Sequence, residues 1–93
     1  MATVIPAILA KDVSTFEEEL MKVQKFVPKV QMDVIDGKFA PVETVTPDVL
    51  LDMEVGTEVE VHLMVEEPIE WVERCAAAGV TAWNRFRSCQ VAS

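Results

Sequence analysis

Three runs of strand-forming residues, each followed by a segment of helical periodicity, constrain the fold more than any other feature of this sequence. The runs span residues 3–9, 29–35 and 58–64. Strands that alternate with helices at this spacing are typical of βαβ units, in which right-handed crossovers join parallel strands. The sequence therefore predicts an α/β protein with a parallel sheet.

Cap and turn residues set the expected bounds of the helices. Residues 14–17 (STFE) have the pattern of a capping box, so a helix is predicted over about 14–26. Threonine followed by proline at 46–47 opens a short helix, and Pro68 opens a third helix that ends at Gly79. The apolar face expected on the third helix consists of Trp71, Val72, Cys75 and Ala76.

Length and charge exclude several classes of protein. Ninety-three residues make one small domain, and no apolar run approaches the roughly 18 residues of a membrane-spanning helix. The net charge of −8 argues against nucleic acid or an anionic membrane as the partner. A phosphorylated small molecule stays open, because backbone N–H groups can bind phosphate.

The N-terminus lacks the pattern of a signal peptide, so a cytoplasmic protein is expected. Cys75 and Cys89 have no metal-site spacing and are expected to be reduced thiols. Residues 80–93 form an atypical tail without acidic residues or clear periodicity. A fourth strand could begin at Val80, but Asn84, Arg85, Arg87 and Ser88 make it a poor buried strand.

Polar side chains recur on one parity of the second and third predicted strands. Gln31 and Asp33 share one face of the second strand, and Glu60 and His62 share one face of the third. We expect Asp33 and His62 near the carboxyl ends of adjacent parallel strands, where α/β proteins bind ligands.

An aspartate and a histidine in this position can ligate a divalent metal or act as acid and base. Spacing alone leaves two simpler interpretations open. His62 could be a hydrogen-bonded core histidine, and Asp33 could cap a turn. Asp36 and Gly37 could form an ordinary Asp-Gly turn with no contact to a ligand.

Three motifs resemble the first three strand ends of the ribulose-phosphate 3-epimerase family. They are residues 5–10 (IPAILA), 30–41 (VQMDVIDGKFAP) and 61–65 (VHLMV), and their order and spacing match over roughly 4–79. The resemblance implies a (β/α)8 TIM barrel. Residues 1–79 would be the N-terminal half of a ribulose-phosphate-binding barrel, with about three βα units and a possible fourth strand.

The activity implied by the resemblance is epimerisation of a ketopentose phosphate at C3, a reaction of carbohydrate metabolism. Two aspartates on opposite faces of the substrate exchange the C3 proton, and a divalent metal, most often zinc, stabilises the enediolate. The resemblance implies that Asp33 is an acid/base residue and metal ligand and that His62 is a metal ligand. The positions it places near the substrate are Ala7, Met32, Met64, Asp36 and Gly37.

The sequence departs from the family pattern at several positions. Gln31 stands where the family has a histidine ligand, and an amide oxygen is a weaker zinc ligand than imidazole. Ala7 replaces a serine that touches the substrate, and Val42 replaces an asparagine. The second catalytic aspartate and the phosphate-binding loops belong to the later half of the barrel. The 93-residue chain is therefore expected to have little or no epimerase activity.

A non-catalytic assembly or binding module built on a half-barrel is the alternative. Three or four parallel strands leave two unpaired edges and an uncovered face. Such a sheet favours self-association, so we expect a homo-oligomer that completes the open sheet.

Overall fold

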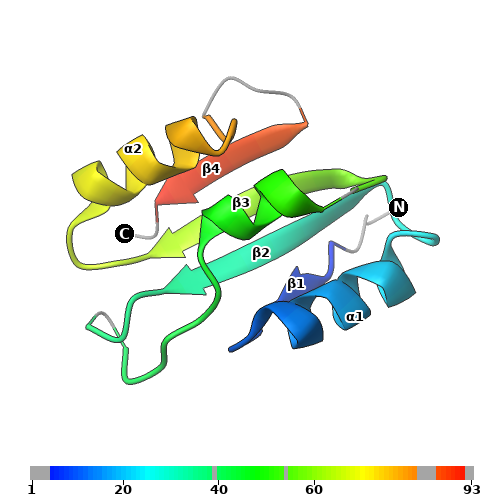
Figure 1. Ribbon diagram of the computed structural model, residues 1–93, viewed down its shortest axis with the longest axis horizontal. Coiled ribbons are helices and arrows are strands. Elements are labelled where there is room, and N and C mark those ends of the chain that lie inside the picture. The colour runs from blue at the N-terminus through cyan, green and yellow to red at the C-terminus, as the bar shows by residue number, and fades with distance from the viewer. Residues whose placement is uncertain (1–4, 39, 54, 82–85, 92–93) are drawn as a thin grey trace.

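The computed structural model describes residues 5–38, 40–53, 55–81 and 86–91. Its four strands form one parallel sheet in the order β1-β2-β3-β4. In chain order the elements are β1 (Ala7–Ile8), α1 (Val13–Val23), β2 (Lys29–Ile35), the 3₁₀ helix η1 (Pro47–Asp52), β3 (Glu58–Met64), α2 (Pro68–Ala77) and β4 (Arg87–Val91). This arrangement confirms the predicted fold class and is consistent with part of a (β/α)8 barrel (Figure 1).

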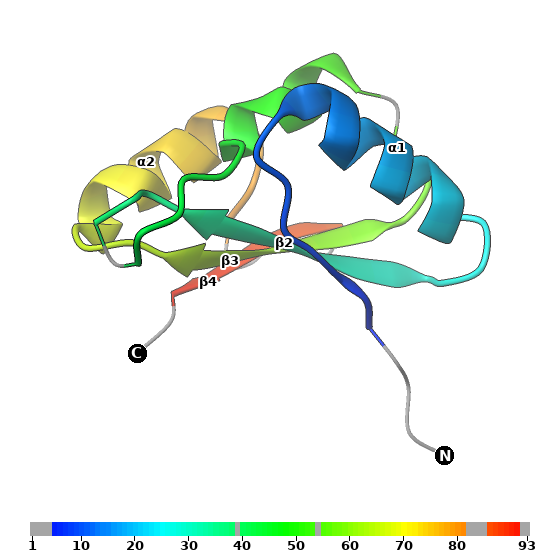
Figure 2. The same ribbon diagram turned by 90° about the horizontal axis from the view of Figure 1, so that it is seen from below.

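The helices all cover the same face of the sheet. Figure 2 shows α1, α2 and η1 as one layer above the strands. Among the described residues no helix covers the opposite face, which we call the open face. Right-handed crossovers place consecutive helices on one side in this way. No helix in the described part of the chain is long and apolar enough to cross a membrane.

The hydrophobic core lies between the sheet and the helices. Alternate residues of β2 and β3 point into it, as their period of two requires. From the sheet the core takes Ile8, Val30, Met32, Val34, Val59, Val61, Leu63 and Cys89, and from the covering layer Phe16, Leu20, Leu50 and Cys75. Full burial of one such side chain contributes about 1.5–3 kcal/mol.

Helix α1 begins earlier than the sequence predicts. Its N-cap is Asp12, whose Oδ1 accepts the backbone N–H of Thr15 at 2.7 Å, so the expected capping box at 14–17 is wrong. This hydrogen bond lowers the pKa of Asp12 below its ordinary value. The helix also ends at Val23 rather than near 26. The Gln24 side chain then accepts the N–H of Gly56 at 3.1 Å, which ties the helix end to the start of the third strand.

Helix α2 ends as predicted but exposes part of the face expected to be apolar. Gly79 has φ +76°, and its N–H and that of Val80 bond to carbonyls of the last turn, a Schellman arrangement. Cys75 is fully buried, whereas Val72 is 43% exposed. The buried contacts of α2 therefore come from Cys75 and Ala78, with Trp71 packed against the core.

The fourth strand lies later in the chain than expected. Strand β4 pairs with β3 through Val59 opposite Arg87 and Leu63 opposite Val91, so part of the segment set apart as a tail joins the sheet. The expected strand start at Val80 is wrong, because Val80 closes α2. Of the residues that weakened that expectation, Asn84 and Arg85 lie outside the described residues, whereas Arg87 and Ser88 belong to β4.

Candidate functional site

The open face carries the polar side chains that share one parity. In the register of β2 and β3, Gln31 lies opposite Glu60 and Asp33 lies opposite His62. The Asp33–His62 pair lies nearer the carboxyl ends of the two strands than the Gln31–Glu60 pair. The predicted placement of Asp33 and His62 on neighbouring parallel strands is therefore confirmed.

Gln31, Asp33 and His62 form one hydrogen-bonded group. The Gln31 Nε2 donates to Asp33 Oδ1 at 2.8 Å and lies 3.1 Å from His62 Nδ1. Asp33 Oδ1 and His62 Nδ1 are 3.7 Å apart. An amide NH2 can only donate, so a hydrogen bond between these two nitrogens requires His62 Nδ1 to be the acceptor, which is the tautomer with the ring proton on Nε2.

The group is partly open to solvent. The side chain of His62 is 33% exposed and that of Asp33 is 14% exposed. The neighbouring carboxylate on the open face, Glu60, forms an ion pair with Lys29 at 2.9 Å. Asp33 is therefore the carboxylate that meets both the histidine and the amide, and a ligand above the sheet can reach it.

The residues of this group do not fit a zinc centre as they are arranged. A catalytic zinc takes three protein ligands from His, Asp, Glu or Cys. Within the described ranges no three such side chains are grouped to hold a metal ion. Asp33 and His62 supply two ligands of the right type, but the third neighbour, Gln31, turns N–H donors toward both.

Asp36 and Gly37 shape the loops beyond this edge of the sheet. Asp36 Oδ1 accepts the N–H of Lys38 at 2.9 Å, and its Oδ2 accepts the N–H of Glu66 at 3.0 Å. The carboxylate thus joins the loop after β2 to the segment after β3. Gly37 has φ +82°, in the left-handed region that favours glycine. Both residues have the turn-forming role that the simpler interpretation gave them.

The apolar positions expected near a substrate divide between the two faces. Ala7 lies opposite Gln31 in the β1–β2 register, and Met64 follows the parity of His62, so both belong to the open face. Met32 is fully buried in the core on the other face, so the structure does not bring it together with Asp33 and His62. Ile35 is a further apolar residue of the open face that the sequence analysis does not name. It shares the parity of Asp33 and lies opposite Met64. Strand alternation alone identifies it.

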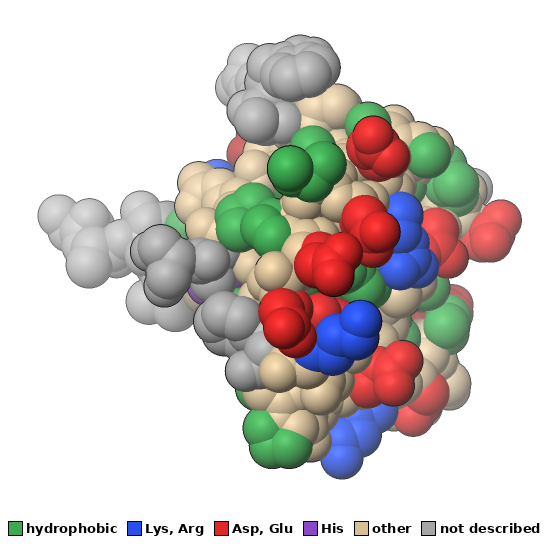
Figure 3. Space-filling model, turned by 90° about the vertical axis from the view of Figure 1, so that its left-hand side faces the viewer, with side chains coloured by type: hydrophobic (Ala, Val, Ile, Leu, Met, Phe, Trp, Pro, Cys, Tyr) green, Lys and Arg blue, Asp and Glu red, His purple; other side chains and the backbone are tan. Residues whose placement is uncertain are grey.

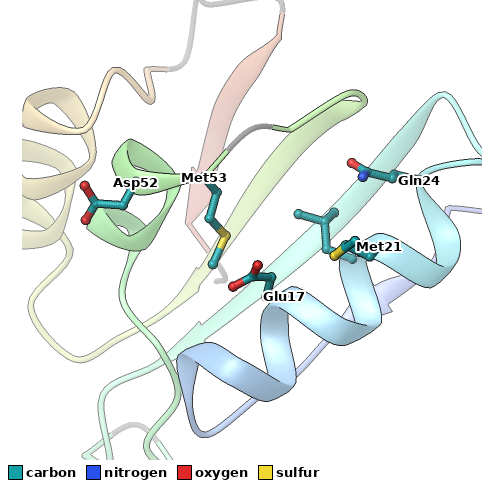
Figure 4. A pocket seen from close by; sticks show the side chains of 6 residues that line it. Glu17, Met21, Gln24, Asp52 and Met53 are labelled. Carbon is teal, nitrogen blue, oxygen red and sulfur yellow. The ribbon is translucent and has the colours of Figure 1, made fainter.

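Two hollows in the described surface lie away from this group. One, of about 310 Å³, lies between α1 and η1 and is lined by Glu17, Leu20, Met21, Gln24, Asp52 and Met53 (Figure 4). The other lies at the amino ends of the strands beside Pro28, Phe86 and Arg87. Acidic side chains spread widely over the side of the molecule in Figure 3, with fewer basic ones between them. Neither hollow contains a predicted site residue.

Comparisons with known proteins point to one family. The family model described as ribulose-phosphate 3 epimerase matches residues 3–86, somewhat further than the motifs at 4–79. The Bacillus subtilis protein named ribulose-phosphate 3-epimerase is 34% identical over 82 residues. The Synechocystis protein of that name is 37% identical over 79 residues. A rice protein named as the cytoplasmic isoform is 28% identical over 86 residues.

These matches cover most of the chain but a minor part of each relative. They span 85%, 82% and 89% of this chain, and 38%, 34% and 38% of the respective relatives. The chain thus corresponds to little more than a third of the length of the curated proteins it matches.

Proposed function

This chain belongs to the ribulose-phosphate 3-epimerase family, and on that premise we propose that Asp33 is an acid/base residue for the epimerisation of a ketopentose phosphate at C3. The observation that carries the proposal is the position of Asp33 beside His62 near the carboxyl ends of β2 and β3. Ligand sites of parallel α/β folds lie at this edge.

In the proposed reaction a carboxylate acts as a base and removes the proton from C3. When a base takes the C3 proton, the C–H electron pair forms a C2–C3 double bond and negative charge develops on the C2 oxygen. Asp33 is an acceptor for that proton on the open face. In the tautomer that accepts the Gln31 N–H at Nδ1, His62 has its ring proton on Nε2, and this nitrogen is then a donor for a substrate oxygen.

Epimerisation also requires a second acid/base group. The configuration at C3 inverts only if the returning proton reaches the opposite side of the carbon. Asp33 and His62 lie on one face of one sheet, so they serve one side of a bound substrate. We therefore expect the 93-residue chain, assayed by itself, to show little or no turnover.

Complementation tests this proposal. We would co-express the chain with the part of the Bacillus subtilis relative that it does not match, verify the complex by co-purification, and assay ribulose 5-phosphate epimerisation. Turnover is expected with the natural chain and not with Asp33→Asn. Asp52→Asn is the matched control, because Asp52 is exposed on η1 and away from the open face. Turnover that survives Asp33→Asn would contradict the assignment.

We also propose that the 93-residue chain associates with a second copy of itself. Strands β1 and β4 are the outer strands of the described sheet, and their outer edges lack strand partners there. Ile5 and Leu9, which flank β1 and share the parity of Ala7, are 43% and 46% exposed. Exposed apolar side chains beside an unpaired edge favour association.

Solution mass by light scattering tests self-association. A dimer or larger species is expected, and Leu9→Lys should shift it toward the monomer. Leu51→Lys is the control, because Leu51 is 63% exposed on η1, which lies on the helix-covered face. A monomer at high concentration would count against the proposal.

We also propose a cytoplasmic location for this chain, which the printed name of the rice relative supports.

A further inference from the structure

Gln31 occupies the point on which the lone pairs of Asp33 and His62 converge. One nitrogen atom, Gln31 Nε2, lies 2.8 Å from Asp33 Oδ1 and 3.1 Å from His62 Nδ1. An amide NH2 has two hydrogens, and each acceptor takes one of them. The donors and acceptors of this contact therefore balance without any ion.

The spacing of the two acceptors would otherwise suit a metal. Two ligands at about 2.1 Å from a tetrahedral zinc ion lie roughly 3.4 Å apart. Asp33 Oδ1 and His62 Nδ1 are 3.7 Å apart, so a small movement would bring both to one ion. The amide nitrogen stands where that ion would have to enter.

Reversal of the Gln31 amide, which exchanges its oxygen and nitrogen, would be unfavourable. It would place the amide oxygen 2.8 Å from Asp33 Oδ1, where two acceptors would face each other without a proton between them. The carboxylate therefore fixes the orientation of the amide. The amide in turn fixes the proton of His62 on Nε2.

We propose that Gln31 takes the place of a divalent metal in this chain: its amide bridges Asp33 and His62, and by doing so it holds the site closed to metal ions. Gln31 is a positioning residue, since it orients the carboxylate and the imidazole through hydrogen bonds. The inference concerns only this group and does not rest on the proposed epimerase activity.

The tautomer of His62 gives the first test and needs no variant. His62 is the only histidine of the chain, so its ring signals in a long-range ¹H–¹⁵N spectrum are unambiguous. The bridge predicts a neutral ring with the proton on Nε2 and a hydrogen-bonded, unprotonated Nδ1. A neutral ring with its proton on Nδ1 would overturn the proposal.

Metal titration gives the second test. Co²⁺ is added to the natural chain and to Gln31→His and Gln31→Glu, with the visible spectrum and the His62 ring signals as readouts. Both substitutions remove the amide NH2 that bridges Asp33 and His62, and both supply a metal-ligating side chain. Each is expected to tighten binding at His62 by at least the roughly 10–100-fold effect of changing an outer-sphere partner. If one variant fails to fold, the other carries the comparison.

Two controls make the result specific. Adding Asp33→Asn to Gln31→His should remove the gain. Gln90→His places an imidazole at the other register neighbour of His62, one strand farther from Asp33, and should bind Co²⁺ more weakly than Gln31→His. Binding by the natural chain as tight as by Gln31→His would overturn the proposal. An equal gain from Gln90→His would do so too.

Discussion

Asp33 on β2 and His62 on β3 lie directly opposite each other, with 3.7 Å between Oδ1 and Nδ1 and the amide nitrogen of Gln31 within hydrogen-bonding distance of both. The parallel register alone brings together residues that are far apart in the sequence. Because the strands alternate, the same register directs the neighbouring apolar side chains into the core. The alternation of polar and apolar residues along β2 and β3 therefore provides both the buried core and the candidate site.

The two methionines expected near a substrate should respond very differently to truncation. Met32→Ala should lower the free energy of unfolding by about 2–5 kcal/mol, because Met32 is fully buried in the core. Met64→Ala should cost less than about 1 kcal/mol, because Met64 lies partly exposed on the open face. Urea unfolding of both variants measures the difference. Equal losses would mean that the faces are assigned incorrectly.

Gly37 should not tolerate a side chain. Its φ of +82° costs an alanine about 1–2 kcal/mol, although the nearest atom to an added Cβ, Glu43 Cβ, is 3.8 Å away. Gly37→Ala is therefore expected to destabilise the protein through backbone conformation rather than through a clash. Gly56→Ala is the control, since Gly56 does not have a positive φ. A similar unfolding midpoint for both variants would refute this account of the turn.

The cap of α1 should make stability depend on pH. The pKa of Asp12 lies below its ordinary value of 3.8 because its carboxylate accepts the Thr15 N–H. Its contribution is therefore present above the ordinary value and is lost as the pH falls through the lowered pKa. Asp12→Asn keeps an N-cap acceptor but does not titrate. Thermal melts between about pH 5 and pH 2 should show a shallower decline for Asp12→Asn than for the natural chain. Parallel declines would rule out this role for Asp12.

The Cys75 thiol should be chemically inert in the folded protein. Burial first, and Cys89 second, raise the pKa of Cys75 from 9.0 to about 12, so the reactive thiolate is scarce at neutral pH. Labelling with iodoacetamide near pH 8, followed by mass spectrometry, should modify Cys75 only after the protein is unfolded. Rapid labelling of the native protein would show that the contact between α2 and β4 opens readily.

Local patterns in the sequence were sufficient for the central strands. The predicted ranges 29–35 and 58–64 coincide with β2 and β3, and the start of α2 at Pro68 was read correctly from a proline at the first helical position. Alternation also placed Asp33 and His62 on one face. These features depend on the period of two and on residues with strong positional preferences.

The predictions that differ from the structure concern features that depend on contacts between distant parts of the chain. The position of β4 depends on pairing with β3, which no local pattern in the tail reveals. The expected capping box at 14–17 does not form, because the Asp12 carboxylate accepts a backbone N–H of the first helical turn. The family resemblance implies a place near the substrate for Met32, whereas the strand alternation directs its side chain into the core. The Gln31 bridge depends on side-chain conformations that a sequence does not specify.

Hydrogen exchange at C3 of ribulose 5-phosphate in deuterated water tests most directly whether Asp33 moves the C3 proton. The measurement uses the chain complemented with the unmatched part of the Bacillus subtilis relative, and NMR follows deuterium incorporation. Deuterium is expected at C3 with the natural chain and with Asp52→Asn, and none above background with Asp33→Asn. Undiminished exchange in the Asp33→Asn complex would contradict the central claim.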